Sequence, residues 1–184
     1  MNPIELLLSR KSNNKLVAPA PDQNQVEQML FAALRAPDHA QLRPWRYRIY
    51  QGDALKGLGD KFLAASLLRI PELSIEKQDR IKTKPLRAPM VIVASVVIKE
   101  HNKVPRVEQI LSAGASVQNL IMAAHFQDIG AIWRTGELTF NRDLMDMLGL
   151  EKNEEIVGFI YLGKEEGIKK PVPQINQSEF VKWM

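Results

Sequence analysis

Three short segments of this sequence place cationic side chains next to hydrogen-bonding ones. They are RKS at residues 10–12, RAPDHAQLRPWRY at residues 35–47 and WRT at residues 133–135. Cations and hydroxyls bind phosphate through charge-assisted hydrogen bonds, and a tryptophan adds aromatic surface. Taken together, the three segments predict a site for a flat, phosphorylated, aromatic cofactor.

Each segment taken alone has a simpler explanation. Basic residues such as Arg10 and Arg35 complement the negative end of a helix dipole when they follow a helix. His39 can bond a backbone carbonyl, and Trp45 and Trp133 can fill the core. The combination of all three segments favours the cofactor site.

The sequence lacks the signatures of several other kinds of site. No G-x-G-x-x-G opens a helix after a strand, and GAS at 114–116 does not fit a nucleophile elbow. GDALKGLG at 52–59 has leucine and glycine where a P-loop has its lysine and hydroxyl residue after the second glycine. There is no cysteine, and the three histidines have no ligand-like spacing, so we expect no metal site. The net charge of +4 suits an anionic partner, from a phosphorylated cofactor to RNA.

The elements of the first half must position the first two segments. With 184 residues the chain is expected to form a single domain, 1–184. Asn2, Pro3 and Glu5 predict the start of a first helix. Asp22 predicts the cap of a helix over 23–36, and a half-buried strand is expected over 46–50.

The second half supplies the larger elements. A helix is expected from residue 53, and the β-branched run MVIVASVVI at 90–98 predicts a strand buried on both faces. The longest helix is expected over 107–127, a short strand over 130–135, a helix over 139–148 and a strand over 155–163. Four strands among five or six helices predict an α+β fold with helices covering a central sheet.

The helix over 107–127 is apolar nearly all round, with small residues at 113–116. A surface helix usually has a single apolar stripe, so this helix is either buried within its own subunit or packed against a second one.

The two ends of the chain carry further expectations. MNPIELLLSRKS has no basic region ahead of a long apolar core, so it is not expected to be a signal peptide, and no run is long enough to span a membrane. A cytoplasmic protein is expected. Residues 164–184 read as a charged C-terminal extension whose Phe180 and Trp183 indicate docking on another surface, such as a partner subunit.

The sequence resembles the nitroreductase family of flavoenzymes, and most closely its compact bacterial NAD(P)H nitroreductase branch. The resemblance runs from residue 4 to about 163 and rests on LLLSRKS, LRAPDHAQLRPWRY, KVPRVEQILSAGASVQNLIMAAH followed by GAIWRTG, and IVGFIYLG. It implies an FMN-binding α+β fold with a central mixed β-sheet. It also implies a homodimer with each flavin at the subunit interface, where the helix over 107–127 would lie.

The resemblance also implies which residues bind the flavin. The implied cofactor-binding residues are Arg10, Lys11, Ser12, Arg35, His39, Trp133, Arg134 and Thr135. Either Arg134 or His39 would face the pyrimidine end of the ring. Asp38–His39 fits the compact branch, whereas Arg43 departs from the family's usual glutamine. KKP at 169–171 resembles a short basic segment that can reach the flavin phosphate in relatives.

The implied reaction is a ping-pong hydride transfer from NAD(P)H, as co-substrate, through FMN to a nitroaromatic, quinone-like or other electron-poor small molecule. The flavin carries the chemistry, so no catalytic side chain is expected. Two alternatives remain: another flavin reaction on the same fold, such as dehydrogenation or flavin cleavage, or a non-catalytic module that binds a polyanion. The dispersed positive charges and the lack of an RNA-module signature argue against nucleic acid.

Overall fold

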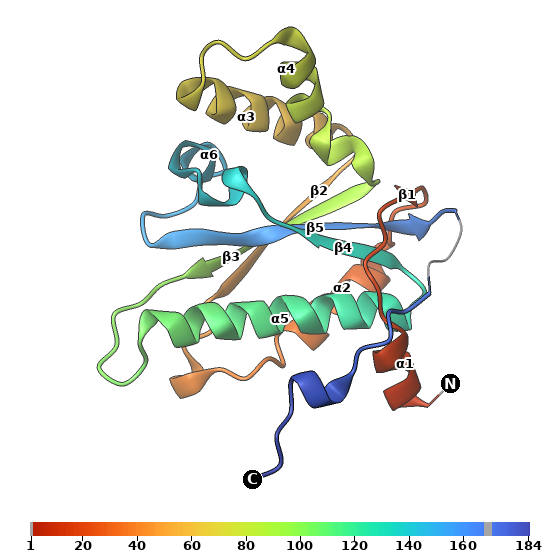
Figure 1. Cartoon of the computed structure of the whole chain (residues 1–184). Helices are drawn as coiled ribbons and strands as arrows, with labels where there is room; N and C mark the ends of the chain where they lie inside the picture. Colours follow the sequence, from red (N-terminus) through yellow and green to blue (C-terminus); the bar gives the residue numbers. More distant parts are fainter. Residues whose placement is uncertain (1, 168–170) are drawn as a thin grey trace.

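The computed structural model describes residues 2–167 and 171–184 (Figure 1). Within these residues the elements are α1 (Pro3–Ser9), β1 (Leu16–Val17), α2 (Gln23–Ala33), the 3₁₀ helix η1 (His39–Gln41), β2 (Trp45–Gln51), α3 (Asp53–Arg69), α4 (Ile75–Lys82), η2 (Lys84–Arg87), β3 (Met90–Val97), α5 (Arg106–Phe126), β4 (Gly130–Arg134), η3 (Glu137–Phe140), α6 (Arg142–Met147), β5 (Glu154–Glu165) and η4 (Gln177–Glu179).

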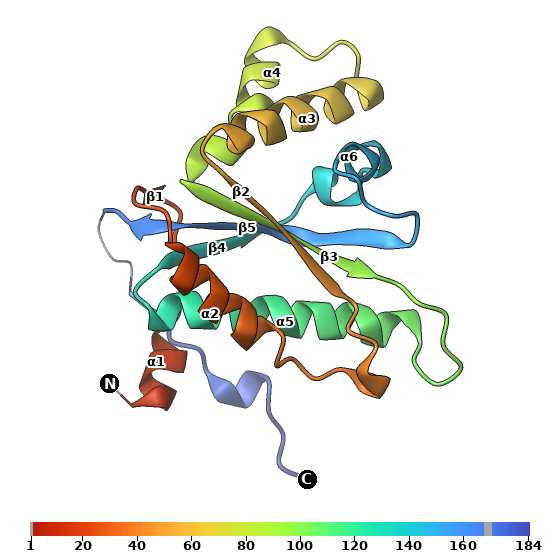
Figure 2. The ribbon, with the colours of Figure 1, turned by 180° about the vertical axis from the view of Figure 1, so that it is seen from behind.

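The strands form one central sheet in the order β1-β5-β3-β2, and β4 also pairs with β5. α2 and α5 cover one face of the sheet, while α3, α4 and α6 lie on the other (Figures 1 and 2). Side chains of β3 alternate between the two layers: Val91 and Val93 pack with α3 and α6, and Ile92 and Ala94 with α2 and α5. The predicted α+β class, with helices flanking a central sheet, is confirmed.

The expectation of a mixed sheet is wrong for the described residues, because every strand pairing in them is antiparallel. The connection between β2 and β3 shows the physical reason. α3 and α4 pack against each other in one excursion, so the chain returns to the end of the sheet that it left. Gln51, the last residue of β2, therefore pairs with Met90, the first residue of β3.

The predicted helix starts are confirmed in detail. The side chain of Asn2 accepts a hydrogen bond from the Glu5 N–H, and the side chain of Asp22 accepts one from the Gln25 N–H, each within a capping box. The helix expected over 23–36 ends earlier, at Ala33, because the next backbone N–H groups form i→i−3 turns ahead of Pro37. The helix expected over 139–148 is divided into η3 and α6.

The structure contains one strand beyond the four that were expected, and it has helices in the polar stretch before β3. The loop between α1 and α2 contains a fifth strand, β1, which pairs Leu16 with Glu165 of β5. Two residues are too few to give a readable alternation in the sequence. The polar stretch before Pro85 is largely helical and forms α4 and the start of η2.

α5 buries only part of its surface within the chain. Its buried residues include Val117, Leu120 and Ala124, which pack in the core cluster that α5 forms with α2 and the sheet. Val107 and Leu111 are 58% and 65% exposed. No helix in the described residues is long and apolar enough to cross a membrane.

Candidate functional site

The first cationic segment, residues 10–12, follows α1 and is fixed at both of its ends. Before it, the Ser9 hydroxyl lies 2.8 Å from the Leu6 carbonyl and 2.9 Å from His125 Nε2. Because the single hydroxyl hydrogen is donated to the carbonyl, the histidine must donate to Ser9. α1 buries no residue of its own, so this bond to the end of α5 is an important anchor.

After the segment, Asn13 bonds to β4 in both directions. The Asn13 N–H donates to the Ala131 carbonyl at 3.0 Å, and the Ala131 N–H donates to Asn13 Oδ1 at 3.0 Å. Residues 10–12 are therefore held between the C-terminal end of α5 and β4. Within the described residues, the side chain of Arg10 makes no hydrogen bond or ion pair, whereas Lys11 forms an ion pair with Glu165 at 3.5 Å.

The second segment, residues 35–47, is a loop with an unusual backbone. Ala40, Gln41 and Arg43 have φ angles of 59°, 53° and 50°, in the left-handed region that residues other than glycine rarely adopt. The Arg43 N–H donates to Asp38 Oδ2 at 2.7 Å, and the Lys99 ammonium donates to a loop carbonyl. Strained backbone that is held in place by its surroundings is typical of functional sites.

This loop presents His39 at the first turn of α5. His39 Nδ1 lies 2.7 Å from Glu108 Oε2. The imidazole remains 53% exposed, so part of the ring can be reached by a further partner.

The third segment, residues 133–135, lies at the end of β4. The Trp133 indole N–H donates to the Val157 carbonyl at 3.3 Å, and the ring packs over Gly158. The Arg134 guanidinium lies 5.6 Å from the centre of the Tyr161 ring. Arg134 Nε is buried and has no hydrogen-bond partner among the described residues. Such an unpaired buried donor calls for a ligand or water.

Replacing Gly158 with alanine is expected to lower the free energy of unfolding by about 1–3 kcal/mol through overpacking. A Cβ atom there would lie 2.0 Å from Trp133 Nε1, so the indole would have to move. Urea unfolding measures the change. Gly57→Ala is the matched control, because a Cβ at that helical position meets nothing within 4 Å and alanine should stabilise an exposed helix by up to about 1 kcal/mol. Equal effects of both substitutions would contradict the packing argument.

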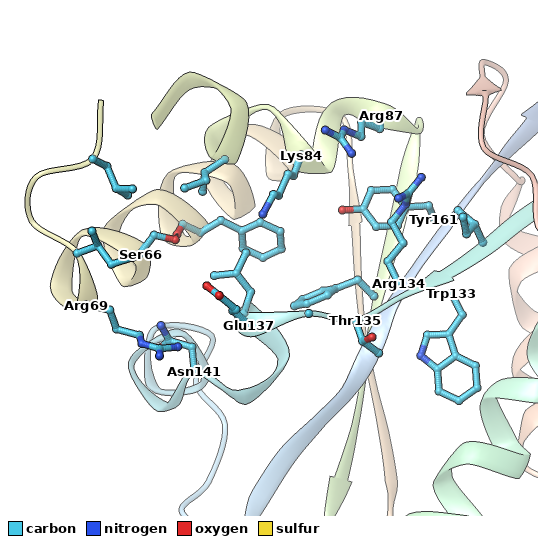
Figure 3. A pocket seen from close by; sticks show the side chains of 18 residues that line it. Ser66, Arg69, Lys84, Arg87, Trp133, Arg134, Thr135, Glu137, Asn141 and Tyr161 are labelled. Atoms are coloured by element: carbon cyan, nitrogen blue, oxygen red, sulfur yellow. The ribbon is translucent and has the colours of Figure 1, made fainter. Parts of the chain in front are cut away.

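A cavity of about 500 Å³ opens beside the third segment (Figure 3). The end of β4, the middle of β5 and η3 form one side of the cavity, and α3, α4 and η2 form the other. The charged and hydrogen-bonding residues of its lining are Ser66, Arg69, Lys84, Arg87, Trp133, Arg134, Thr135, Glu137, Asn141 and Tyr161. Four cations thus share the cavity with one carboxylate.

Only Trp133, Arg134 and Thr135 of this set were named from the sequence, and the other seven were missed, among them Lys84, Arg87 and Tyr161. Burial raises the pKa of Tyr161, while nearby Arg134 and Arg87 act to lower it. Burial is also the largest cause that lowers the pKa of Lys84, followed by the charge of Arg87. The dense basic run KTKPLR before β3 was the available signal, but only the fold shows that it faces β4.

The structure brings together only part of the predicted site within one chain. Asn13 pairs with Ala131, which lies about 10 Å before Arg134 at the rise of a strand, so the first and third segments are neighbours. His39 contacts Glu108, whereas the first segment is anchored at His125. These two residues of α5 are about 26 Å apart along the helix. His39 of the second segment therefore lies away from the first segment in the same chain.

Two further parts of the prediction bear on the site. Two residues of the basic KKP segment, 169 and 170, lie outside the described residues. Phe180 and Trp183 of the C-terminal extension are 74% and 96% exposed, so these side chains are not packed into a core. The backbone of the extension runs past α5 (Figure 1). No group of three or more potential metal ligands occurs in the described part of the chain.

Comparison with known proteins places this geometry in a family. The nitroreductase family model matches residues 7–164. The chain is 38% identical over 166 residues to "Putative NAD(P)H nitroreductase YdjA" of Escherichia coli strain K12, covering 89% of this chain and 88% of that protein.

Two solved structures share the fold. A nitroreductase-like protein from Bacillus cereus superposes with a TM-score of 0.85 at 21% identity, covering 100% of this chain and 96% of that one. A structure from Desulfovibrio desulfuricans, described as a putative nitroreductase in complex with FMN, has a TM-score of 0.76 at 20% identity and covers 100% of this chain and 98% of that one. The chain belongs to the nitroreductase family.

Proposed function

We propose that the protein is an FMN-dependent NAD(P)H oxidoreductase of nitroreductase type. Bound FMN would supply the hydride acceptor and donor of a ping-pong cycle between NAD(P)H and a nitroaromatic, quinone-like or other electron-poor acceptor. The observation that carries the proposal is the unpaired, buried Nε of Arg134 beside a cation-lined cavity. The relative with the NAD(P)H nitroreductase name and the FMN-bound neighbour support it.

The residues around β4 fit FMN in their chemistry. Arg10 has no partner among the described residues, and with Lys11 and Ser12 it would hold the phosphate through charge-assisted hydrogen bonds. Arg134 and Thr135 would donate to the heteroatoms of the ring. Gly136 has a φ of +118° and open space around its Cα, so the backbone after Thr135 can be approached closely. These two segments lie next to each other in one chain.

A homodimer would complete the site with residues of the second segment. Within one chain, His39 and Ser9 are attached near opposite ends of α5. A twofold axis at the middle of α5 would bring the N-terminal end of one α5 next to the C-terminal end of the other. Arg35 and His39 of one subunit would then reach the flavin held by residues 10–12 and 133–135 of its partner.

The exposed apolar surface supports the same arrangement. Val107 and Leu111 of α5 and Leu7 and Leu8 of α1 are each more than half exposed. Exposed apolar side chains therefore lie near both ends of α5, as an antiparallel pairing of two copies of α5 would require. The extension after β5, with its exposed Trp183, would also dock on the partner subunit.

In the proposed cycle the side chains bind, orient and supply charge. Arg134 lies at the end of β4, where its guanidinium would stabilise the negative charge of the reduced cofactor. His39 of the partner would contact the edge of the same ring. No side chain need act as a general acid or base, because the acceptor can take its proton from water.

The absorption spectrum of freshly purified protein tests the proposal. We expect a yellow protein that releases FMN, and not FAD, on denaturation, and that is bleached by NADH or NADPH under anaerobic conditions. Oxidation of the bleached protein by a nitroaromatic or a quinone would distinguish this reaction from other flavin reactions. A protein that stays colourless after incubation with FMN would refute the proposal.

A further inference from the structure

Two cations project from one side of a 3₁₀ helix into the cavity. Lys84 and Arg87 are the first and last residues of η2. Side chains three residues apart on a 3₁₀ helix lie above one another, and the buried Pro85 anchors the helix to the protein. Figure 3 shows both side chains on the wall that faces Tyr161 and Arg134.

The cavity side of η2 and β5 offers hydrogen-bond donors and positive charge that no described side chain accepts. Within the described residues, Lys84, Arg87 and the Tyr161 hydroxyl have no hydrogen bond or ion pair. The one carboxylate of the lining, Glu137, forms no ion pair with a described cation. Bringing two cations together raises the energy of the free protein. The pKa of Lys84 is lowered first by burial and then by the charge of Arg87. An anion in the cavity would relieve that repulsion.

The phosphate of FMN is not needed to explain this cluster. Residues 10–12, which the proposed function assigns to that phosphate, do not line the cavity. They lie beside Ala131, near the start of β4, whereas Arg134 lies at its end. The cluster is therefore positioned for a second anionic group, on a molecule that enters the cavity.

We propose that Lys84, Arg87 and Tyr161 form an oxyanion subsite that binds the carboxylate or phosphate of a reactant next to the flavin. This inference rests on the proposed function, and it identifies the substrate class. The reactant is either an anionic electron acceptor or a phosphorylated nicotinamide donor, NADPH. Arg134 lies between the subsite and the flavin and contributes charge to both.

Calorimetric titration of the purified protein with benzoate and with benzamide tests the subsite. The two probes have nearly the same shape and differ in charge. We expect benzoate to bind at least about tenfold more tightly, as for one charge-assisted hydrogen bond. Arg87→Gln should remove most of this preference while leaving benzamide binding unchanged. Tyr161→Phe keeps the buried ring and should weaken benzoate binding about threefold.

Lys77→Gln is the matched control. It removes one positive charge from α4, in the same excursion, at an exposed residue that does not line the cavity. Its benzoate affinity should equal that of the wild type. Two kinetic arms then identify the reactant. Arg87→Gln raises KM for NADPH relative to NADH if the donor uses the subsite, and KM for 4-nitrobenzoate relative to 4-nitrobenzamide if the acceptor does.

Flavin content is read from the absorbance of the same samples. Protein that binds no flavin would refute the proposed function. The benzoate and benzamide titrations can still be carried out on that protein, so they test the subsite independently. Equal wild-type affinities for benzoate and benzamide would overturn the subsite alone. So would an Arg87→Gln variant that folds by circular dichroism and loses FMN affinity but keeps its preference for benzoate, because the cluster would then serve the cofactor.

Discussion

Replacing Arg10 with alanine is expected to weaken FMN binding by roughly ten- to a hundred-fold, the effect of losing a charge-assisted hydrogen bond of about 1.5–3 kcal/mol. The guanidinium of Arg10 has no partner among the described residues, so nothing within the chain competes for it. The backbone around it is fixed through Ser9 and Asn13. Titration of the apo-variant with FMN, followed by quenching of flavin fluorescence, measures the change.

Lys11→Ala is the matched control for this prediction. Lys11 already forms an ion pair with Glu165 at 3.5 Å and is 21% exposed in its side chain. Part of its charge is therefore used to hold the loop against β5, and its loss should affect FMN less than the loss of Arg10. Equal FMN affinities for wild type and Arg10→Ala would remove this residue from the site.

Local structure was the part of the fold that the sequence predicted best. The capping boxes at Asn2 and Asp22 each involve residues three apart, so they can be read directly from the chain. MVIVASVVI supplies β3, which is buried over its whole length. In both cases the information is confined to a few neighbouring residues, and tertiary contacts only reinforce it.

Strand direction and the cavity depended on tertiary structure. The antiparallel pairing of β2 with β3 follows from the helical excursion of α3 and α4, whose second helix lies in a polar stretch with no buried residue. The same excursion carries Lys84 and Arg87 over the end of β4. No spacing in the sequence connects these cations with Tyr161, because the contact depends on how the excursion folds back.

The candidate site shows the same division. The sequence identified Arg134, and the structure gives that residue the buried, unpaired donor expected of a ligand-binding group. The sequence grouped Arg35 and His39 with it, but α5 separates His39 from the first segment in the folded chain. A linear motif cannot show whether its residues act in their own subunit or in a second one.

Gly114 of α5 provides a test of the second-subunit arrangement. A Cβ atom at this position would meet only the Trp133 ring, at 3.9 Å, and leucine has a higher helix propensity than glycine. The isolated chain should therefore accommodate a Cβ at this position, and circular dichroism checks that Gly114→Leu still folds. Gly114 lies on the helix beside the exposed Leu111, near the middle of α5, so a second copy packed there would be pushed away.

We therefore expect Gly114→Leu to dissociate the dimer and release FMN together. Overpacking costs about 1–3 kcal/mol at each site, and a twofold interface contains the substitution twice, so the dissociation constant should rise by at least about 30-fold. FMN leaves because the partner's Arg35 and His39 are withdrawn. Sedimentation velocity recorded at protein and flavin wavelengths measures both losses on dilution. Gly57→Leu is the control, at a helical glycine with nothing within 4 Å of its Cβ position, and should keep dimer and flavin. If the wild type sediments as a monomer with flavin bound, the second segment acts elsewhere and the flavin is held within one chain.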